Sequence, residues 1–130
     1  MNIALRHGMA TVEREVAAPP EKVWDLLVDL RAWPKWGPTV ERAELDEPGL
    51  LALGSRGRVW TPFGLALPFT ITEFDPGRSW RWEVAGIPAT RHEVWPTDWG
   101  ARVVFGAPWW AAAYLPVFAV ALQRIERMTH

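Results

Sequence analysis

Two spacings of apolar residues recur along this chain, and they predict which segments are helices and which are strands. After residue 20, apolar side chains repeat at i, i+3, i+4 and i+7, the spacing of one buried helical face. Pro20 and Glu21 indicate the helix start, because proline is tolerated at the first helical position and a carboxylate favours the positive pole of the helix dipole. Trp33-Pro34 breaks the pattern. The predicted buried face consists of Val23, Leu26, Leu27 and Leu30.

The middle of the chain changes to short strand-like runs separated by turn residues, the pattern of an antiparallel meander. Pro48-Gly49 and Asp75-Pro76-Gly77 are two of these breaks, since proline fixes φ and glycine reaches positive φ. Pro68 falls inside one run, which predicts a sheet edge or a bulge there. The predicted strands span residues 9–17, 39–47, 55–62, 65–75, 79–86, 89–97 and 100–106.

A helical spacing returns after Pro108 and continues to a predicted end near Thr129. Arg124 and Arg127 suit the negative pole at that end. Two neighbouring apolar stripes mean that the helix must be covered widely. One stripe is Trp110, Tyr114, Val117, Ala121, Ile125 and Met128, and the other is Leu115, Phe118, Leu122 and Ile125.

The same region lacks charge, which raises the question of a membrane span. No charged residue lies between Arg102 and Arg124, a length compatible with the roughly 20 residues that cross a bilayer. Gly106, Pro108 and Pro116 interrupt the stretch, however, and leave too short a helix. We therefore expect a buried helix of a globular domain and no integral membrane segment.

Two motifs connect these elements to a known family. Ala17-Ala18-Pro19-Pro20-Glu21-Lys22-Val23-Trp24 and Trp33-Pro34-Lys35-Trp36-Gly37 resemble the START-like helix-grip (SRPBCC) superfamily, in its polyketide cyclase/dehydrase and lipid-transport branch. Residues 73–82 and the closing apolar helix also fall where that family has them. The resemblance implies one α+β domain over residues 1–130. Its expected fold is helix-grip: a seven-stranded curved antiparallel sheet wrapped around a long C-terminal helix, with two short helices after the first strand.

In relatives with this fold the space between sheet and helix is the ligand cavity, so the inward face of each strand matters. Successive side chains of a strand point to opposite faces of the sheet, so every second residue is assigned to the inward face. In the 55–62 strand, burying Arg56 and Arg58 without partners is costly, so these side chains are predicted to point outward and Val59 inward. The other predicted inward residues are Trp80, Trp82, Val84, Thr90, His92, Val94, Ala101, Val103 and Phe105.

Composition narrows the function. The formal net charge is −1, with basic and acidic residues interspersed, which argues against nucleic-acid binding. The absence of cysteine excludes disulfides, thiolate nucleophiles and Cys-ligated zinc, and no histidine spacing suggests a metal site, so we expect neither a metal nor a cofactor. Residues 1–9 lack the apolar core of a secretory signal, which makes cytoplasmic localisation the expectation.

Ten tryptophans are the main compositional anomaly. Each indole buries roughly 150–250 Å² and carries one N–H donor, so a Trp-rich lining suits aromatic or polycyclic ligands. The same rings can instead fill the cavity as core, and for Trp80 and Trp82 both interpretations stay open. Trp36 is expected at the cavity mouth, while for Trp109 and Trp110 core packing is favoured over a membrane-interface or dimer patch.

Catalysis has two weak candidates, His92 and Tyr114. A buried histidine can donate to a ligand carbonyl or transfer protons, but Arg91 and Glu93 lie on the opposite face, so no carboxylate orients it. Tyr114 is a candidate because family enzymes that cyclise or dehydrate polyketides use such side chains inside the cavity. Whether the protein is an enzyme stays open.

The favoured function is therefore binding of a hydrophobic small molecule, such as a lipid, an aromatic or a polyketide-like compound, in a cavity between sheet and helix. The alternatives are a polyketide cyclase/dehydrase-type enzyme and an interaction module, with a homodimer as one form, whose cavity is filled by tryptophan. The predicted ligand-contacting residues are Trp36, Val59, Trp80, Trp82, Thr90, His92, Phe105, Tyr114 and Phe118.

Overall fold

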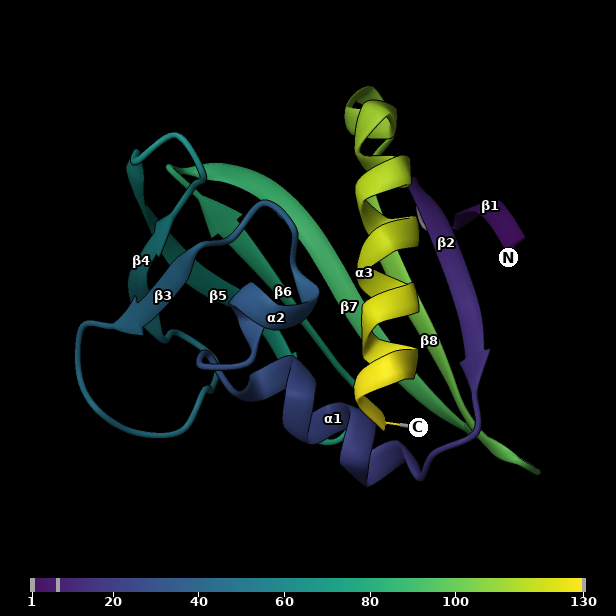
Figure 1. Ribbon diagram of the computed structural model, residues 1–130. Coiled ribbons are helices and arrows are strands. Elements are labelled where there is room, and N and C mark those ends of the chain that lie inside the picture. The colour runs from purple at the N-terminus through teal and green to yellow at the C-terminus, as the bar shows by residue number, and fades with distance from the viewer. Residues whose placement is uncertain (1, 7, 130) are drawn as a thin grey trace.

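The structure is a computed structural model that describes residues 2–6 and 8–129. Within them, one antiparallel sheet of eight strands curves around a C-terminal helix (Figure 1). The strand order across the sheet is β1-β2-β8-β7-β6-β5-β4-β3. The strands are β1 (Asn2–Arg6), β2 (Met9–Val16), β3 (Arg42–Leu45), β4 (Arg56–Trp60), β5 (Ala66–Asp75), β6 (Ser79–Val84), β7 (Ile87–Thr97) and β8 (Gly100–Pro108). The helices are α1 (Pro20–Val28), α2 (Trp33–Trp36), the 3-10 helix η1 (Trp109–Tyr114) and α3 (Leu115–Thr129).

The predicted helix-grip fold is confirmed, and each of the seven predicted strands is present. The sheet has one strand more than predicted, because β1 pairs with β2 and places Asn2 opposite Glu13. The turn between them contains Gly8 at φ 74°, a conformation that glycine reaches without strain. The prediction missed β1 because the first nine residues carry no long alternating run.

The segment that contains Pro68 is predicted to be a sheet edge or a bulge, and the edge alternative is wrong. β5 is an interior strand between β6 and β4, with Pro68 opposite Arg58. The irregularity in β5 lies further along, as a register shift between Ile71 and Glu73. Pro68 is only the third residue of the strand and its carbonyl still accepts a hydrogen bond from the Ala85 N–H, so the ladder continues beyond it.

The first helix forms as its apolar spacing predicts. Val23 and Leu27 are fully buried, and Leu26 and Leu30 pack half-buried against the same core. Trp33 begins α2, so the Trp33-Pro34 break is itself the start of the second helix.

The C-terminal segment is two helices where the spacing predicts one. η1 departs from helical geometry at Ala111 (φ −107°, ψ 29°). Pro116 is the second residue of α3, a position whose N–H has no acceptor within the helix, so the proline breaks no helical hydrogen bond. α3 ends at Thr129 as predicted. None of the described helices is long and apolar enough to cross a membrane.

The core lies between the concave face of the sheet and the helices. α3 runs across that face over β2 and β8, while α1 lies across one end of the sheet against β7 and β8 (Figure 1). Most of the predicted inward residues are buried here, and Val94, Ala101 and Val103 have no exposed surface. Trp82, Val84 and Thr90 are half-buried. Arg56 and Arg58 are exposed, as the cost of burying them predicts.

Candidate functional site

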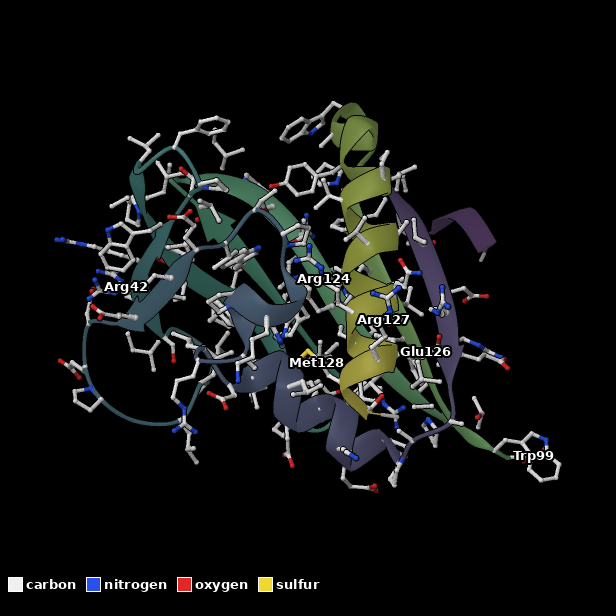
Figure 2. All side chains as sticks on the ribbon, viewed as in Figure 1. Arg42, Trp99, Arg124, Glu126, Arg127 and Met128 are labelled. Carbon is white, nitrogen blue, oxygen red and sulfur yellow. The ribbon has the colours of Figure 1, made fainter. Side chains whose placement is uncertain are left out.

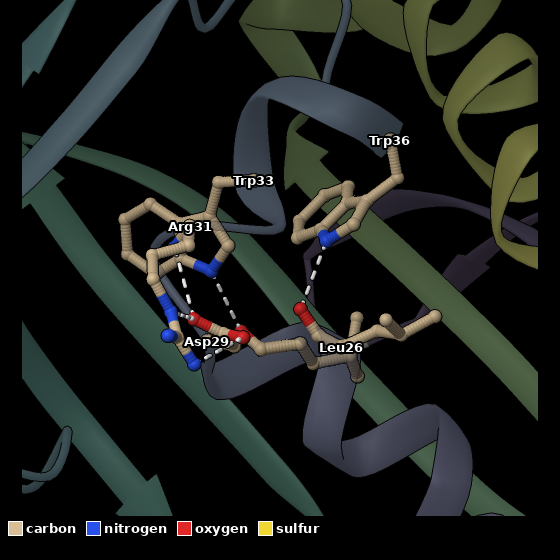
Figure 3. Close-up of polar contacts among 6 residues, drawn as sticks. Leu26, Asp29, Arg31, Trp33 and Trp36 are labelled. Atoms are coloured by element: carbon tan, nitrogen blue, oxygen red, sulfur yellow. Dashed lines mark hydrogen bonds and ion pairs between the residues drawn. The ribbon is translucent and has the colours of Figure 1, made fainter. Parts of the chain in front are cut away.

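Two indole N–H groups fix α2 over the concave face of the sheet. Trp33 Nε1 donates to the Leu27 carbonyl and Trp36 Nε1 to the Leu26 carbonyl, each at 2.9 Å (Figure 3). These carbonyls belong to the last turn of α1, where they have no partner within the helix. The motif that resembles the family therefore has a local physical role, because its tryptophans satisfy the end of the preceding helix.

The turn between the two helices is held by an ion pair. The backbone N–H and Nε of Arg31 donate to Asp29 Oδ1 at 3.0 and 3.1 Å (Figure 3). The Arg31 hydrogen bond holds the pKa of the Asp29 carboxyl below its usual value. Arg31 is largely exposed, so the pair orders the turn more than it stabilises the fold.

A cluster of rings forms the inner wall of the site. The indole of Trp80 stacks on Trp33 with ring centroids 5.1 Å apart, and on the His92 imidazole at 3.9 Å. Trp82 meets Trp33 and Trp80 edge-on, at 5.4 and 5.5 Å. Phe105 meets His92 edge-on at 4.8 Å. The contacts among the tryptophans and between Phe105 and His92 lie at distances at which aromatic rings attract one another.

Beside this wall lies a cavity of about 320 Å³ between the sheet, α2, η1 and α3. Its volume falls at the lower end of the range for small-molecule sites. Among the described residues, none of those that line it is Asp, Glu, Lys or Arg. All nine predicted ligand-contacting residues line this cavity: Trp36, Val59, Trp80, Trp82, Thr90, His92, Phe105, Tyr114 and Phe118.

A polar cluster formed by Trp82, Thr90 and His92 lies in the mainly apolar lining. Trp82 Nε1 donates to Thr90 Oγ1 at 2.8 Å, and the same oxygen lies 3.2 Å from His92 Nε2. The three side chains come from adjacent strands, β6 and β7, and line the cavity. Alternation predicts that they share a face, but the hydrogen bonds among them depend on side-chain rotamers.

His92 is held neutral by its surroundings. Its side chain is buried, and desolvation lowers the pKa of His92 to about 3, opposed weakly by the backbone of Trp80. Within the described part of the chain, Nδ1 is buried and has no partner at hydrogen-bonding geometry. No carboxylate among the residues that the structure describes hydrogen-bonds to the ring, in line with the strand alternation, which places Glu93 on the opposite face.

Tyr114 lies at the opposite side of the cavity, at its mouth. Its hydroxyl donates to Thr39 Oγ1 at 3.2 Å, which connects η1 to the loop after α2. A row of edge-to-face contacts runs from His92 through Phe105 and Phe118 to Tyr114, so two phenylalanine rings separate the two catalytic candidates. They do not form an acid–base pair.

The mouth also contains residues that the sequence did not assign to it. Trp110 is 58% exposed and lines the cavity, so the prediction of core packing is wrong for this residue. Ile87, at 55% exposed, lines the mouth from the first position of β7. Leu67 was also missed, although it pairs with Val59 across strands and so shares its face. The loop at 37–40 contributes lining residues and has no periodicity that could reveal them.

An antiparallel sheet curved around a C-terminal helix, with an apolar cavity between them, defines a helix-grip protein. The model of the family described as polyketide cyclase/dehydrase and lipid transport matches residues 8–127, and the chain belongs to this family. A search of curated proteins found no match.

Solved structures share the fold at low sequence identity. A crystal structure of a protein from Mesorhizobium loti has a TM-score of 0.73 at 16% identity, over 92% of this chain and 95% of that one. A solution structure of a protein from Bacillus halodurans has a TM-score of 0.72 at 13% identity, over 98% and 100%. The solution structure of the Aha1 dimer from Colwellia psychrerythraea has a TM-score of 0.70 at 18% identity, over 92% and 93%.

Proposed function

We propose that this protein binds a hydrophobic small molecule, such as a lipid, an aromatic or a polyketide-like compound, in the cavity between the sheet and α3. The observation that carries the proposal is an open cavity of about 320 Å³ whose wall combines stacked aromatic rings with very few polar groups. Such a wall favours apolar ligands because it removes their surface from water without leaving polar groups unpaired.

A cyclase/dehydrase-type reaction is the alternative within the same family, and the site favours it less. Such a reaction needs a group that moves protons near neutral pH. With a pKa of about 3, His92 is a weak base, and no carboxylate among the described residues orients it. Tyr114 lies at the mouth and is partnered with Thr39. Binding without turnover is therefore the preferred function.

An interaction module with a filled cavity is the other alternative. Trp33, Trp80 and Trp82 occupy the inner end, but they leave the cavity open beside them. The exposed Trp110 and the dimeric state of one solved neighbour keep a homodimer as a version of this alternative. Sedimentation velocity tests the homodimer, since a monomer at micromolar concentration argues against this form of the interaction module.

The proposal is tested by native mass spectrometry of the purified protein, followed by denaturation to release any retained small molecule. The apo protein is then incubated with fatty acids, quinones and aromatic polyketides. Two variants on α3 form a matched pair. Val117→Trp adds an indole inside the cavity, whereas Val120→Trp adds one at a position that is 39% exposed and outside the lining.

We expect a discrete retained mass that Val117→Trp abolishes and Val120→Trp keeps. Both variants should remain folded, as judged by circular dichroism. If no compound is retained by the wild type and none of the panel binds, the binding function is wrong and the interaction module becomes the better interpretation.

A further inference from the structure

The polar cluster of Trp82, Thr90 and His92 restricts what the cavity can hold. Thr90 Oγ1 is its centre, because it receives the Trp82 N–H and lies within hydrogen-bonding distance of His92 Nε2. Thr90 is only half-buried, and its hydroxyl belongs to the cavity wall. A ligand in the cavity can therefore reach the Thr90 hydroxyl, whose two protein partners, Trp82 Nε1 and His92 Nε2, are already in place.

The hydrogen-bonding capacity of this hydroxyl follows from the protonation of His92. Neutral imidazole carries one proton, on Nε2 or on Nδ1. With the proton on Nε2, Thr90 accepts two hydrogen bonds and its own O–H is free to donate to a ligand oxygen. With the proton on Nδ1, the Thr90 O–H donates to Nε2 and one lone pair stays free to accept from a ligand. A ligand hydroxyl satisfies either arrangement, and a ligand carbonyl satisfies the first.

The charge of the wall sets a second restriction. Among the described residues no cationic side chain lines the cavity, so a ligand carboxylate buried there has no counter-charge. Burying an unpaired charge costs far more than burying a hydroxyl that finds a partner. The cavity volume of about 320 Å³ sets the third restriction. This volume lies near the lower end of the range for small-molecule sites, so the part of a ligand that enters the cavity is small.

We infer that the ligand is a small, uncharged, mainly apolar molecule whose single hydroxyl or carbonyl oxygen hydrogen-bonds to Thr90 Oγ1. This inference rests on the proposed binding function and names the class of ligand for the same cavity. It excludes free fatty acids and other carboxylates as preferred ligands.

Three probes with one ring system test this inference: naphthalene, 2-naphthol and 2-naphthoate, measured by equilibrium dialysis at pH 7.5. The wild type should bind 2-naphthol about three- to tenfold more tightly than naphthalene, the range expected for one neutral hydrogen bond. It should bind 2-naphthoate at least about tenfold more weakly than 2-naphthol. Thr90→Val should bind naphthalene as the wild type does and lose the preference for 2-naphthol.

A matched control is Thr70→Val, a strand threonine on β5 outside the cavity lining, which should keep the preference. Equal binding of naphthalene and 2-naphthol by the wild type, or preferred binding of 2-naphthoate, overturns the inference while the binding function stands. Binding of none of the three probes counts against the binding function itself. If Thr90→Val does not fold, Thr90→Ser must keep the wild-type preference, and loss of the preference in a folded serine variant contradicts the role of the hydroxyl.

Discussion

The indoles of Trp33 and Trp80 share one hydrogen-bond acceptor. Both Nε1–H groups donate to the Leu27 carbonyl, at 2.9 and 3.0 Å, and the two rings stack with an interplanar angle of 15°. All three side chains are buried. This arrangement ties the end of α1 to α2 and to the middle of the sheet, and it supports the inner wall of the cavity.

The shared acceptor predicts a non-additive effect on stability. Trp33→Phe or Trp80→Phe removes one donor but leaves the Leu27 carbonyl with the other. The double variant leaves a buried carbonyl without a side-chain donor, and an unsatisfied buried group costs more than a lost hydrogen bond. The double variant should therefore lose about 1 kcal/mol more unfolding free energy than the sum of the single variants. Urea denaturation followed by circular dichroism measures the cycle.

The control for this cycle uses Trp36, whose N–H donates to a different carbonyl, that of Leu26. Trp36→Phe combined with Trp80→Phe should show a smaller coupling than the Trp33 and Trp80 pair, because Trp36 and Trp80 share the His92 ring as a neighbour but no hydrogen-bond acceptor. Additive behaviour in the Trp33 and Trp80 cycle means that the shared carbonyl has no energetic consequence.

Much of the cavity wall could be predicted because a strand has a period of two. Once Trp80, His92 and Phe105 are assigned to strands, a single choice of face for each strand puts them on the same side of the sheet. The register confirms this, since His92 lies opposite Trp80 on β6 and opposite Phe105 on β8. For each strand, the apolar face is the one that points toward the core, because its burial is favourable.

The features that were missed depend on information that periodicity does not contain. β1 is a short strand at the sheet edge, and only its pairing with β2 reveals it. Trp110 lines the cavity together with Tyr114 and Val117 of its predicted stripe, but it lies in η1 and is 58% exposed, which the spacing does not reveal. The hydrogen bonds from Trp82 to Thr90 and from Trp33 to Leu27 depend on rotamers, which the sequence does not specify.

His92 predicts an acid-sensitive component of stability. Burial lowers the pKa of His92 to about 3, whereas the unfolded side chain titrates near 6.5. Between these two pH values the unfolded chain binds a proton that the folded protein does not, so acid favours unfolding. Relative to His92→Phe, the wild type should lose about 1.4 kcal/mol of unfolding free energy per pH unit between pH 6 and pH 4.

Phenylalanine is the suitable replacement because it retains a ring against Trp80 and Phe105 and does not titrate. Losing the contact with Thr90 shifts the stability of the variant by a constant, while the carboxylates contribute equally to both proteins. Urea denaturation at half-unit pH intervals gives the two slopes. Parallel slopes mean that His92 is not buried in its neutral form.

Arg14 connects the sheet to the end of α3 and predicts a modest stabilisation. Its guanidinium lies 2.7 Å from Glu126 Oε1, with side-chain exposures of 29% and 36%, and Figure 2 shows Glu126 on the last turns of α3. The hydrogen bond to Glu126 raises the pKa of Arg14. Because both side chains are partly solvated, Arg14→Met should cost only about 0.5–1 kcal/mol of unfolding free energy. A loss above about 2 kcal/mol means that the pair is effectively buried.

Gly57 predicts a large effect of a single methyl group. A Cβ at this position of β4 would lie 2.1 Å from the Glu44 carbonyl oxygen and 2.7 Å from the Phe69 ring, so Gly57→Ala forces β3 and β4 apart. We expect a loss of about 1–3 kcal/mol in unfolding free energy, together with weaker naphthalene binding because β4 carries Val59 into the cavity wall.

Gly106 on β8 provides the matched control for Gly57. The nearest atom to an added Cβ there is Thr11 Cγ2 at 3.4 Å, an ordinary packing distance, so Gly106→Ala should change stability by less than about 1 kcal/mol. Thermal and urea denaturation of the two alanine variants compares them directly. Equal stabilities show that the β3–β4 pair accommodates a side chain at position 57, and that the close approach of its strands is not required for the cavity.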